Sequence, residues 1–209
     1  SNIKSKFPYS RYAALSELRI ADAYFAQDQF ATAVEQYRNF IQLHPKHEKR
    51  VYARFRIALA FYELMPDNFF LMPPAYERDL SKTEDAAREL ELFVENYPKS
   101  QYTKRARKLL AKARRRLADH EFYVAEFYLD RDNWRAAAMR LTYLLQNYSG
   151  LGLDAQALFL LAKSYLELGD VQRARDALAD LITVHPDSEY AQRAKEYVSE
   201  YDLNLEIEQ

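Results

Sequence analysis

The chain has 209 residues and a formal net charge of -1, so its overall charge gives no reason to expect binding to nucleic acid or to an anionic membrane. It contains no cysteine, which excludes disulfides, thiolate metal sites and a thiol nucleophile. Only three glycines occur, which disfavours turn-rich sheets and glycine-rich phosphate loops, whereas the abundant Ala, Leu, Arg, Glu and Lys favour helices.

Residues 1–9 are interpreted as the end of an upstream repeat, because Phe7 and Pro8 resemble the close of a helix pair. We therefore expect the native protein to extend further towards the N-terminus, where any targeting or lipidation signal would lie. Residues 10–99 form the N-terminal half of a repeat array. Its first copy ends at Pro45 and has apolar or small residues at repeat positions 7, 8, 11, 17, 20, 24, 27 and 28: Ile20, Ala21, Tyr24, Phe30, Ala33, Tyr37, Phe40 and Ile41.

A second copy is split by an inserted loop, residues 65–82. Its first helix is expected to carry Ile57 and Phe61, and its second helix Leu90 and Phe93. The insertion makes the turn between these helices about 16 residues longer than the repeat period allows. It is rich in proline and aromatic residues, and two interpretations stay open: a loop that packs on its own side chains, or a lid over a binding site.

No helix breaker interrupts residues 100–130, so this segment is predicted to be one long connecting helix of roughly 45 Å. Residues 131–187 form the C-terminal half, with the clearest repeat at residues 155–186. Residues 188–209 are expected to add a capping helix and an acidic tail. The predicted fold is therefore all-α, a right-handed superhelix of tetratricopeptide repeats, or α-solenoid.

A Pro-x-Ser-x-Tyr motif occurs three times, beginning at Pro8, Pro98 and Pro186. In each copy the proline would end one helix, and the serine is a natural N-cap for the next. The motif is therefore interpreted as a junction between repeats.

The concave face of such an array is lined by the first helix of each repeat, at repeat positions 2, 5, 9 and 12. Position 5 is a large apolar residue in each copy: Leu18, Phe55, Phe122 and Phe159. Four further residues fall on the same face: Asp22, Phe25, Tyr52 and Tyr62. These eight residues predict a groove fit for an extended peptide with bulky side chains. The alternative is that the rings pack against neighbouring helices.

Residues 104–116 contain eight lysines and arginines and no acid. The candidates for contact with a partner in this run are Lys104, Arg105, Lys108 and Arg115. Because the apolar stripe of the helix is intact and no aromatic residue interleaves the charges, a solvated face or a protein contact is favoured over nucleic acid.

No combination of nucleophile, base and metal ligands predicts catalysis, so the chain is expected not to be an enzyme and to need no cofactor or metal. His44 and His47 lie beside a helix breaker, where an ordinary loop is favoured over a metal site.

Several stretches resemble the BamD family. Residues 97–104 (YPKSQYTK) and 116–134 (RLADHEFYVAEFYLDRDNW) are similar to its long central helix and the turn that follows. Residues 7–12, 22–25 and 38–45 resemble its first half, and the likeness covers nearly all of the chain. Two differences from the family are expected: the residues given begin after its first helix pair and lipidated cysteine, and a helix follows the last repeat.

The resemblance implies a lipid-anchored protein at the periplasmic face of the bacterial outer membrane. It implies a scaffold and substrate receptor of the outer-membrane β-barrel assembly machinery. The implied partners are the barrel subunit BamA, smaller accessory lipoproteins and unfolded outer-membrane proteins, whose C-terminal targeting strands it would receive.

Two other functions are possible from the residues alone. One is a different periplasmic repeat adaptor for cell-envelope assembly or division, which a trimerising coiled coil upstream would favour. The other is a nucleic-acid-binding solenoid, which would use residues 104–116 and would show salt-dependent retention on immobilised nucleic acid.

Overall fold

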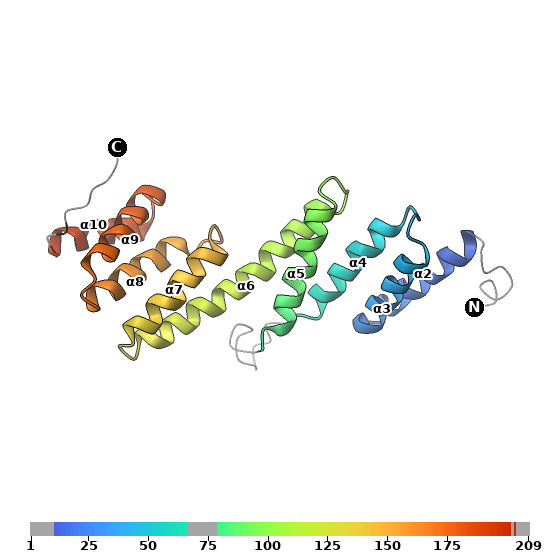
Figure 1. Ribbon diagram of the computed structural model, residues 1–209, viewed down its shortest axis with the longest axis horizontal. Coiled ribbons are helices and arrows are strands. Elements are labelled where there is room, and N and C mark those ends of the chain that lie inside the picture. Colours follow the sequence, from blue (N-terminus) through green and yellow to red (C-terminus); the bar gives the residue numbers. More distant parts are fainter. Residues whose placement is uncertain (1–10, 67–78, 202, 204–209) are drawn as a thin grey trace. The chain divides into compact units, whose positions relative to one another are not determined.

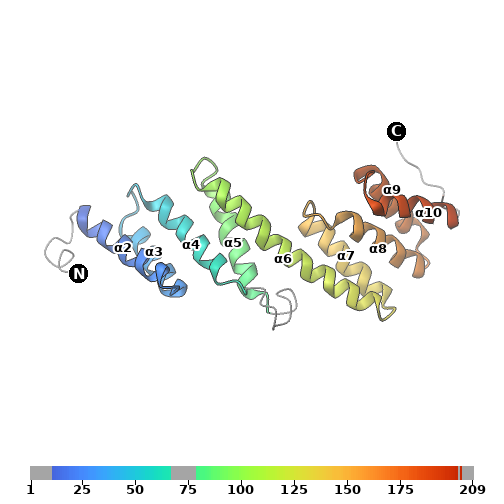
Figure 2. The same ribbon diagram turned by 180° about the vertical axis from the view of Figure 1, so that it is seen from behind.

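The computed structural model describes residues 11–66, 79–201 and 203 of the chain. Regular structure in these ranges is helical throughout: α2 (Arg11–Ala26), α3 (Phe30–Leu43), α4 (Arg50–Glu63), α5 (Ser81–Asn96), α6 (Thr103–Leu129), α7 (Trp134–Tyr148), α8 (Asp154–Glu167), α9 (Val171–Val184) and α10 (Glu189–Glu200). Helices that follow one another run in opposite directions (Figures 1 and 2). The predicted all-α fold is confirmed, whereas a right-handed superhelix describes the overall path of the chain and stays a prediction. None of the described helices is both long and apolar enough to cross a bilayer.

The chain divides into two compact units, residues 1–114 (unit 1) and 115–209 (unit 2). The boundary lies inside α6, so the connecting helix expected at residues 100–130 is a single helix shared by both units. In unit 1 the first half of α6 packs through Ala106 on α4 and α5. In unit 2 its second half packs through Phe122 on α7 and α8.

Three expectations concern segments outside the described residues. These are the end of an upstream repeat at residues 1–9, the lid within residues 67–78 of the insertion, and most of the acidic tail, residues 204–209. The insertion can be followed only at its two ends. Met65 is buried where α4 ends, and Asp79 accepts a hydrogen bond from the backbone N–H of Ser81, where α5 begins (2.9 Å).

Small residues lie where the helices of each pair approach most closely. Repeat positions 8 and 20 are occupied by alanines that expose at most 1% of their surface: Ala21, Ala33, Ala58, Ala86, Ala125, Ala137, Ala162 and Ala174. A methyl group at these positions allows two backbones to come close, while larger residues such as Leu141 and Leu178 fill the remaining space. The repeat register read from the sequence therefore matches the packing.

The turn inside each uninterrupted pair uses the same backbone conformation. Repeat position 15 has a positive φ in all three copies, at Asp28 (57°), Asp132 (53°) and Gly169 (75°). Glycine adopts this left-handed conformation without steric cost, and aspartate is among the other residues that tolerate it. The turn then places Asn133 and Asp170 as N-caps, whose side chains accept hydrogen bonds from the backbone N–H groups of Ala136 and Arg173.

The Pro-x-Ser-x-Tyr motif has a second role that its sequence did not indicate. Ser188 caps α10 by accepting a hydrogen bond from the Ala191 N–H (3.1 Å), as expected for a junction. In addition, the tyrosine of each described motif contacts the ring at position 5 of an earlier helix. The ring centroids lie 4.9 Å apart for Tyr102 and Phe55, and 5.9 Å apart for Tyr190 and Phe159.

Candidate functional site

A groove of about 570 Å³ lies in unit 2, between the second half of α6, the start of α7 and α8; we call it the α6–α8 groove. Its lining includes repeat positions expected on the concave face, such as Glu126 and Lys163 at position 9 and Gln156 at position 2. Phe127, 42% exposed, and Trp134 contribute rings. The remaining lining residues are Tyr123, Leu129, Asp130, Arg131 and Leu160.

In the α6–α8 groove a cationic side chain lies beside each of two aromatic rings. The Arg131 guanidinium lies 3.6 Å from the centre of the Phe127 ring, and the Lys163 ammonium lies 5.6 Å from that of Trp134. Burial, and more weakly the charge of Asp130, raise the pKa of the Glu126 carboxyl. This lining can hold apolar side chains and hydrogen-bond polar groups.

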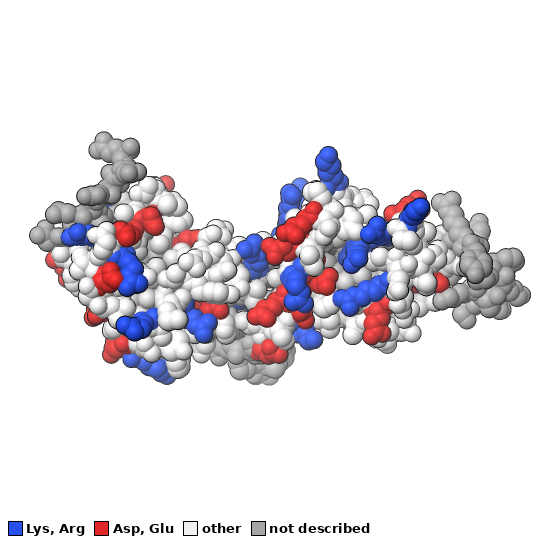
Figure 3. Space-filling model, in the orientation of Figure 1, with Lys and Arg blue, Asp and Glu red and all other residues white. Residues whose placement is uncertain are grey.

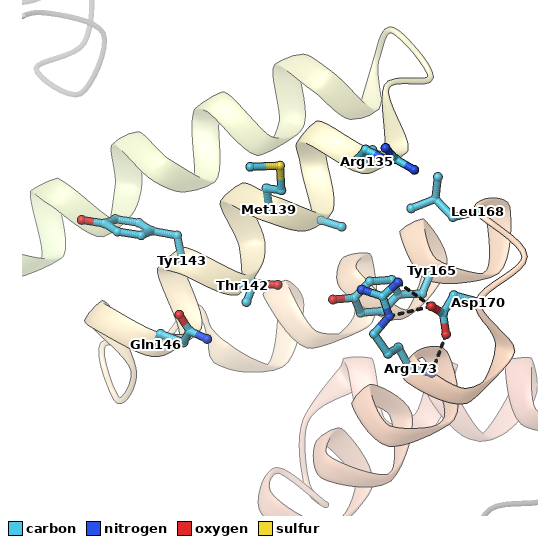
Figure 4. Close-up of a pocket in the computed structure, with 10 residues that line it drawn as sticks. Arg135, Met139, Thr142, Tyr143, Gln146, Tyr165, Leu168, Asp170 and Arg173 are labelled. Carbon is cyan, nitrogen blue, oxygen red and sulfur yellow. Dashed lines mark hydrogen bonds and ion pairs between the residues drawn. The ribbon is translucent and has the colours of Figure 1, made fainter.

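A second pocket in unit 2, of about 620 Å³, lies between α7, the end of α8 and the start of α9; we call it the α7–α9 pocket (Figure 4). Met139 and Tyr143 project from α7 and are 69% and 45% exposed. At the other side Arg173 lies over the ring of Tyr165 (4.5 Å) and donates a hydrogen bond to Asp170 (2.6 Å). Exposed apolar side chains rimmed by polar ones are typical of protein-binding surfaces.

Unit 1 contains a polar cluster that joins three helices, and we call it the Asp22 cluster. The hydroxyls of Tyr37 and Tyr52 both donate to one carboxylate oxygen of Asp22, each at 2.7 Å. Arg56 donates from Nε to the Tyr37 hydroxyl (3.0 Å), and its guanidinium lies 3.7 Å from the centre of the Phe25 ring. Burial and the hydrogen bond to Asp22 raise the pKa of Tyr52 to about 12 and that of Tyr37 further.

The Asp22 cluster accounts for three of the eight predicted groove residues. Asp22, Phe25 and Tyr52 are brought together, but their polar groups and rings contact one another and Arg56. Tyr62 is half-buried beside a different part of the unit 1 core, around Phe55 and Leu59.

The structure corrects the expectation for the residues at repeat position 5. Leu18, Phe55, Phe122 and Phe159 expose only 2% to 8% of their surface, so they do not line an open groove in this structure. Position 5 packs against the next first helix of the array or against the residue just before it. Leu18 shares a core with Ile57 on α4, and Phe159 lies 5.1 Å from the ring of Tyr197 on α10. These four side chains therefore pack against neighbouring helices, which is the alternative given for them from the sequence.

The four basic candidates on α6 are all exposed, but they differ in their contacts. Arg115 donates to Asp119 (2.7 Å) and to the backbone oxygen of Leu151 (2.6 Å), so its guanidinium has partners within unit 2. The guanidinium of Arg105 lies 5.6 Å from the centre of the Phe55 ring. Lys104 and Lys108 form no ion pair with any described residue.

The two histidines near Pro45 take part in packing. His44 Nε2 lies 2.9 Å from a carboxylate oxygen of Glu17, and the rings of His44 and His47 lie 5.3 and 5.2 Å from that of Phe40. Within the described ranges, no three acids, histidines or cysteines are grouped so as to hold a metal ion.

Sequence reasoning missed the exposed apolar residues of unit 2. Phe127, Met139 and Tyr143 fall at repeat positions 10, 22 and 26, which are not core positions of the repeat. Large apolar residues at such outward positions were a signal that could have indicated both the α6–α8 groove and the α7–α9 pocket.

The family follows from a comparison with known proteins. A family model named YfiO, described as "Outer membrane lipoprotein", matches residues 1–179. The chain belongs to this family. Relatives of the YfiO family named outer membrane protein assembly factor BamD come from several bacteria. The chain is 30% identical over 196 residues to that of Neisseria meningitidis, covering 92% of this chain and 73% of the relative. It is 28% identical over 187 residues to that of Xylella fastidiosa, covering 88% of this chain and 63% of the relative.

Among solved structures, a Podosopora anserina "putative kinesin light chain" with nearly identical TPR-like repeats is similar at a TM-score of 0.32 and 15% identity. The likeness covers 90% of this chain and 87% of the other. This likeness is too low to bear on the fold, which follows from the helices themselves.

Proposed function

We propose that this member of the YfiO family is a non-enzymatic scaffold and substrate receptor in outer-membrane β-barrel assembly, lipid-anchored at the periplasmic face. Family membership and the relatives named BamD support the general role. The observation that carries the receptor role is the α6–α8 groove, in which the rings of Phe127 and Trp134 lie beside the cations of Arg131 and Lys163. The groove binds the C-terminal targeting strand of a barrel precursor.

The chemistry of a barrel strand matches that of the groove. Strands of membrane barrels alternate apolar and polar side chains, and an extended strand offers unpaired backbone N–H and C=O groups on its edges. Phe127 and Trp134 provide apolar contact area, and Gln156, Asp130 and Lys163 provide donors and acceptors for backbone groups. Because the groove is formed by rigid helices, few of the groove's side chains need to become ordered when an extended segment binds, which lowers the entropic cost of binding.

The α7–α9 pocket is proposed as the docking surface for a folded partner, the barrel subunit or an accessory lipoprotein. Met139 and Tyr143 supply an apolar centre, and Arg135, Gln146 and Arg173 supply a polar rim.

The receptor role is tested by titration with a labelled peptide that alternates apolar and polar residues and ends in phenylalanine. Trp134 is the single tryptophan of the chain, so its fluorescence reports directly on the groove. Phe127→Ala should weaken binding by about tenfold or more, as expected for loss of more than roughly 1.4 kcal/mol at a buried aromatic contact. The matched control is Leu43→Ala, which removes an exposed apolar side chain on α3 outside the groove. Equal binding by parent and Phe127→Ala would refute this site.

The docking role needs a separate measurement. Met139→Asp should weaken capture of the barrel subunit's periplasmic domains and leave the peptide titration unchanged, because Met139 does not line the α6–α8 groove. If Met139→Asp captures those domains as well as the parent, the α7–α9 pocket is not the docking surface.

A further inference from the structure

The first half of α6 carries a row of lysines on its exposed face. Lys104, Lys108 and Lys112 are each four residues apart, so each lies about 6 Å further along the helix and about 40° further round it. We call these three residues the lysine ridge. All three are exposed, and none forms an ion pair with a residue that the structure describes. The opposite face of the helix is buried through Ala106 and Ala113.

The ridge is a local excess of positive charge in a nearly neutral protein. No aspartate or glutamate occurs from residue 97 to residue 118, although the whole chain has 31 acids against 30 lysines and arginines. Over much of the face in view in Figure 3, by contrast, basic and acidic side chains lie next to one another. Arg114 and Arg115, at the far end of this stretch, have acidic partners: Arg114 lies 3.8 Å from Glu91, and Arg115 lies 2.7 Å from Asp119. The uncompensated charge therefore lies on the ridge and on the adjacent arginines Arg105 and Arg107.

The surroundings of the ridge distinguish between kinds of anionic partner. Protein interfaces are depleted in lysine at their centres and have exposed apolar anchors, but no large apolar side chain is exposed among the described residues from 93 to 126. Single-stranded nucleic acid is held by aromatic stacking as well as charge, and no aromatic side chain lies on this face between Thr103 and Leu117. A hydrated layer of lipid phosphates requires neither feature, because it attracts basic residues without shape complementarity.

We propose that the lysine ridge of α6 binds anionic phospholipid headgroups at a bilayer surface, as an electrostatic contact additional to the lipid anchor of the family. Membership of an outer membrane lipoprotein family places the chain near such a surface. Each lysine near an anionic bilayer strengthens binding about fivefold, so three together give on the order of a hundredfold at low salt. The contact is screened within about 10 Å at 0.1 M salt, so it requires the ridge to face the headgroups closely.

The test is sedimentation of the full chain with vesicles of phosphatidylcholine alone or of phosphatidylcholine containing phosphatidylglycerol. The ridge variant is Lys104→Gln, Lys108→Gln, Lys112→Gln. The matched control is Lys49→Gln, Lys82→Gln, Lys195→Gln, which removes the same charge from three exposed lysines on other helices or turns. Circular dichroism and thermal unfolding first establish that both triple variants are folded.

We expect the parent to bind the anionic vesicles and not the neutral ones, and binding to weaken with added salt. The ridge variant should lose on the order of a hundredfold in partitioning, and the control less than about tenfold. Equal losses in the two triple variants, or equal binding of the parent to both kinds of vesicle, would overturn the proposal. Binding of soluble polyglutamate as tightly as the anionic vesicles, with the same dependence on the ridge, would overturn it in favour of an acidic protein surface. Because the readout is vesicle binding, its failure leaves the peptide titration at the α6–α8 groove unaffected.

Discussion

The ring of Phe55 stacks on the ring of Tyr102, with centroids 4.9 Å apart and planes within 9° of parallel. Phe55 belongs to α4 and Tyr102 immediately precedes α6, so the pair holds two first helices of unit 1 together. Phe159 makes the corresponding contact with Tyr190 in unit 2. The position 5 rings are therefore part of the packing between repeats.

Phe55→Ala should lower the free energy of unfolding by about 3 to 5 kcal/mol, because it removes a buried ring and leaves a cavity against Tyr102 and Phe93. Denaturant unfolding followed by circular dichroism measures this loss. Tyr143→Ala is the control, since this residue is 45% exposed and its loss should cost much less than that of the buried Phe55 ring. Unchanged stability together with lost peptide binding would restore Phe55 as a ligand-binding ring.

Stability should fall at alkaline pH because of the Asp22 cluster. The pKa of Tyr52 is about 12 in the folded chain, against an ordinary value near 10, and that of Tyr37 is raised further. A raised folded pKa contributes stability that is fully present below pH 10 and is lost as pH rises towards and through 12. Denaturant midpoints at pH 9 and above, and spectrophotometric titration of the 17 tyrosines, measure the effect.

The tyrosine titration has an internal control. In Asp22→Asn both hydroxyls lose a hydrogen bond to a carboxylate and the repulsion of its charge, so the late-titrating tyrosines should ionise at lower pH than in the parent. If all tyrosines of the folded parent titrate together near pH 10, the cluster does not exist in solution as described.

Ala162→Leu should destabilise unit 2 by roughly 1 to 3 kcal/mol. Ala162 lies at repeat position 8 of α8 and has no exposed surface, so a larger side chain forces the paired helix away. Ala111→Leu, on the exposed face of α6, adds the same atoms without overpacking and should change the denaturant midpoint little. A midpoint for Ala162→Leu equal to that of the parent would show that the repeat register is wrong.

Asp132→Gly should stabilise the protein by up to about 1 kcal/mol. Asp132 has a φ of 53°, a conformation that costs roughly 1 kcal/mol or more for a residue with a side chain, and Gly169 occupies the same repeat position with a φ of 75°. The greater flexibility of glycine in the unfolded chain offsets part of this gain. Asp187→Gly, where φ is not positive, should only destabilise, and thermal unfolding compares the two variants.

The sequence by itself determined the order of the helices and the residues that pair them. A period of 3.6 residues places the apolar positions on one face, and a small residue is needed where two helices touch. The buried alanines from Ala21 to Ala174 could therefore be identified by counting. Helix breakers likewise indicated where most helices end. These features depend on local geometry, which neighbouring residues fix.

Only the tertiary structure decided which helix faces remain open. The helical period assigns Phe122 and Phe127 to faces of α6, but α8 covers Phe122 and leaves Phe127 partly exposed. The spacing of residues within one helix does not indicate where its neighbour lies. The same holds for long charged side chains: Arg115 reaches a backbone oxygen of Leu151, 36 residues away, whereas Lys108 meets no described partner. Exposure and ion pairing depend on elements that approach from elsewhere in the chain. The sequence therefore indicated the basic run of α6, but not which of its side chains lack a described partner or where the α6–α8 groove and the α7–α9 pocket lie.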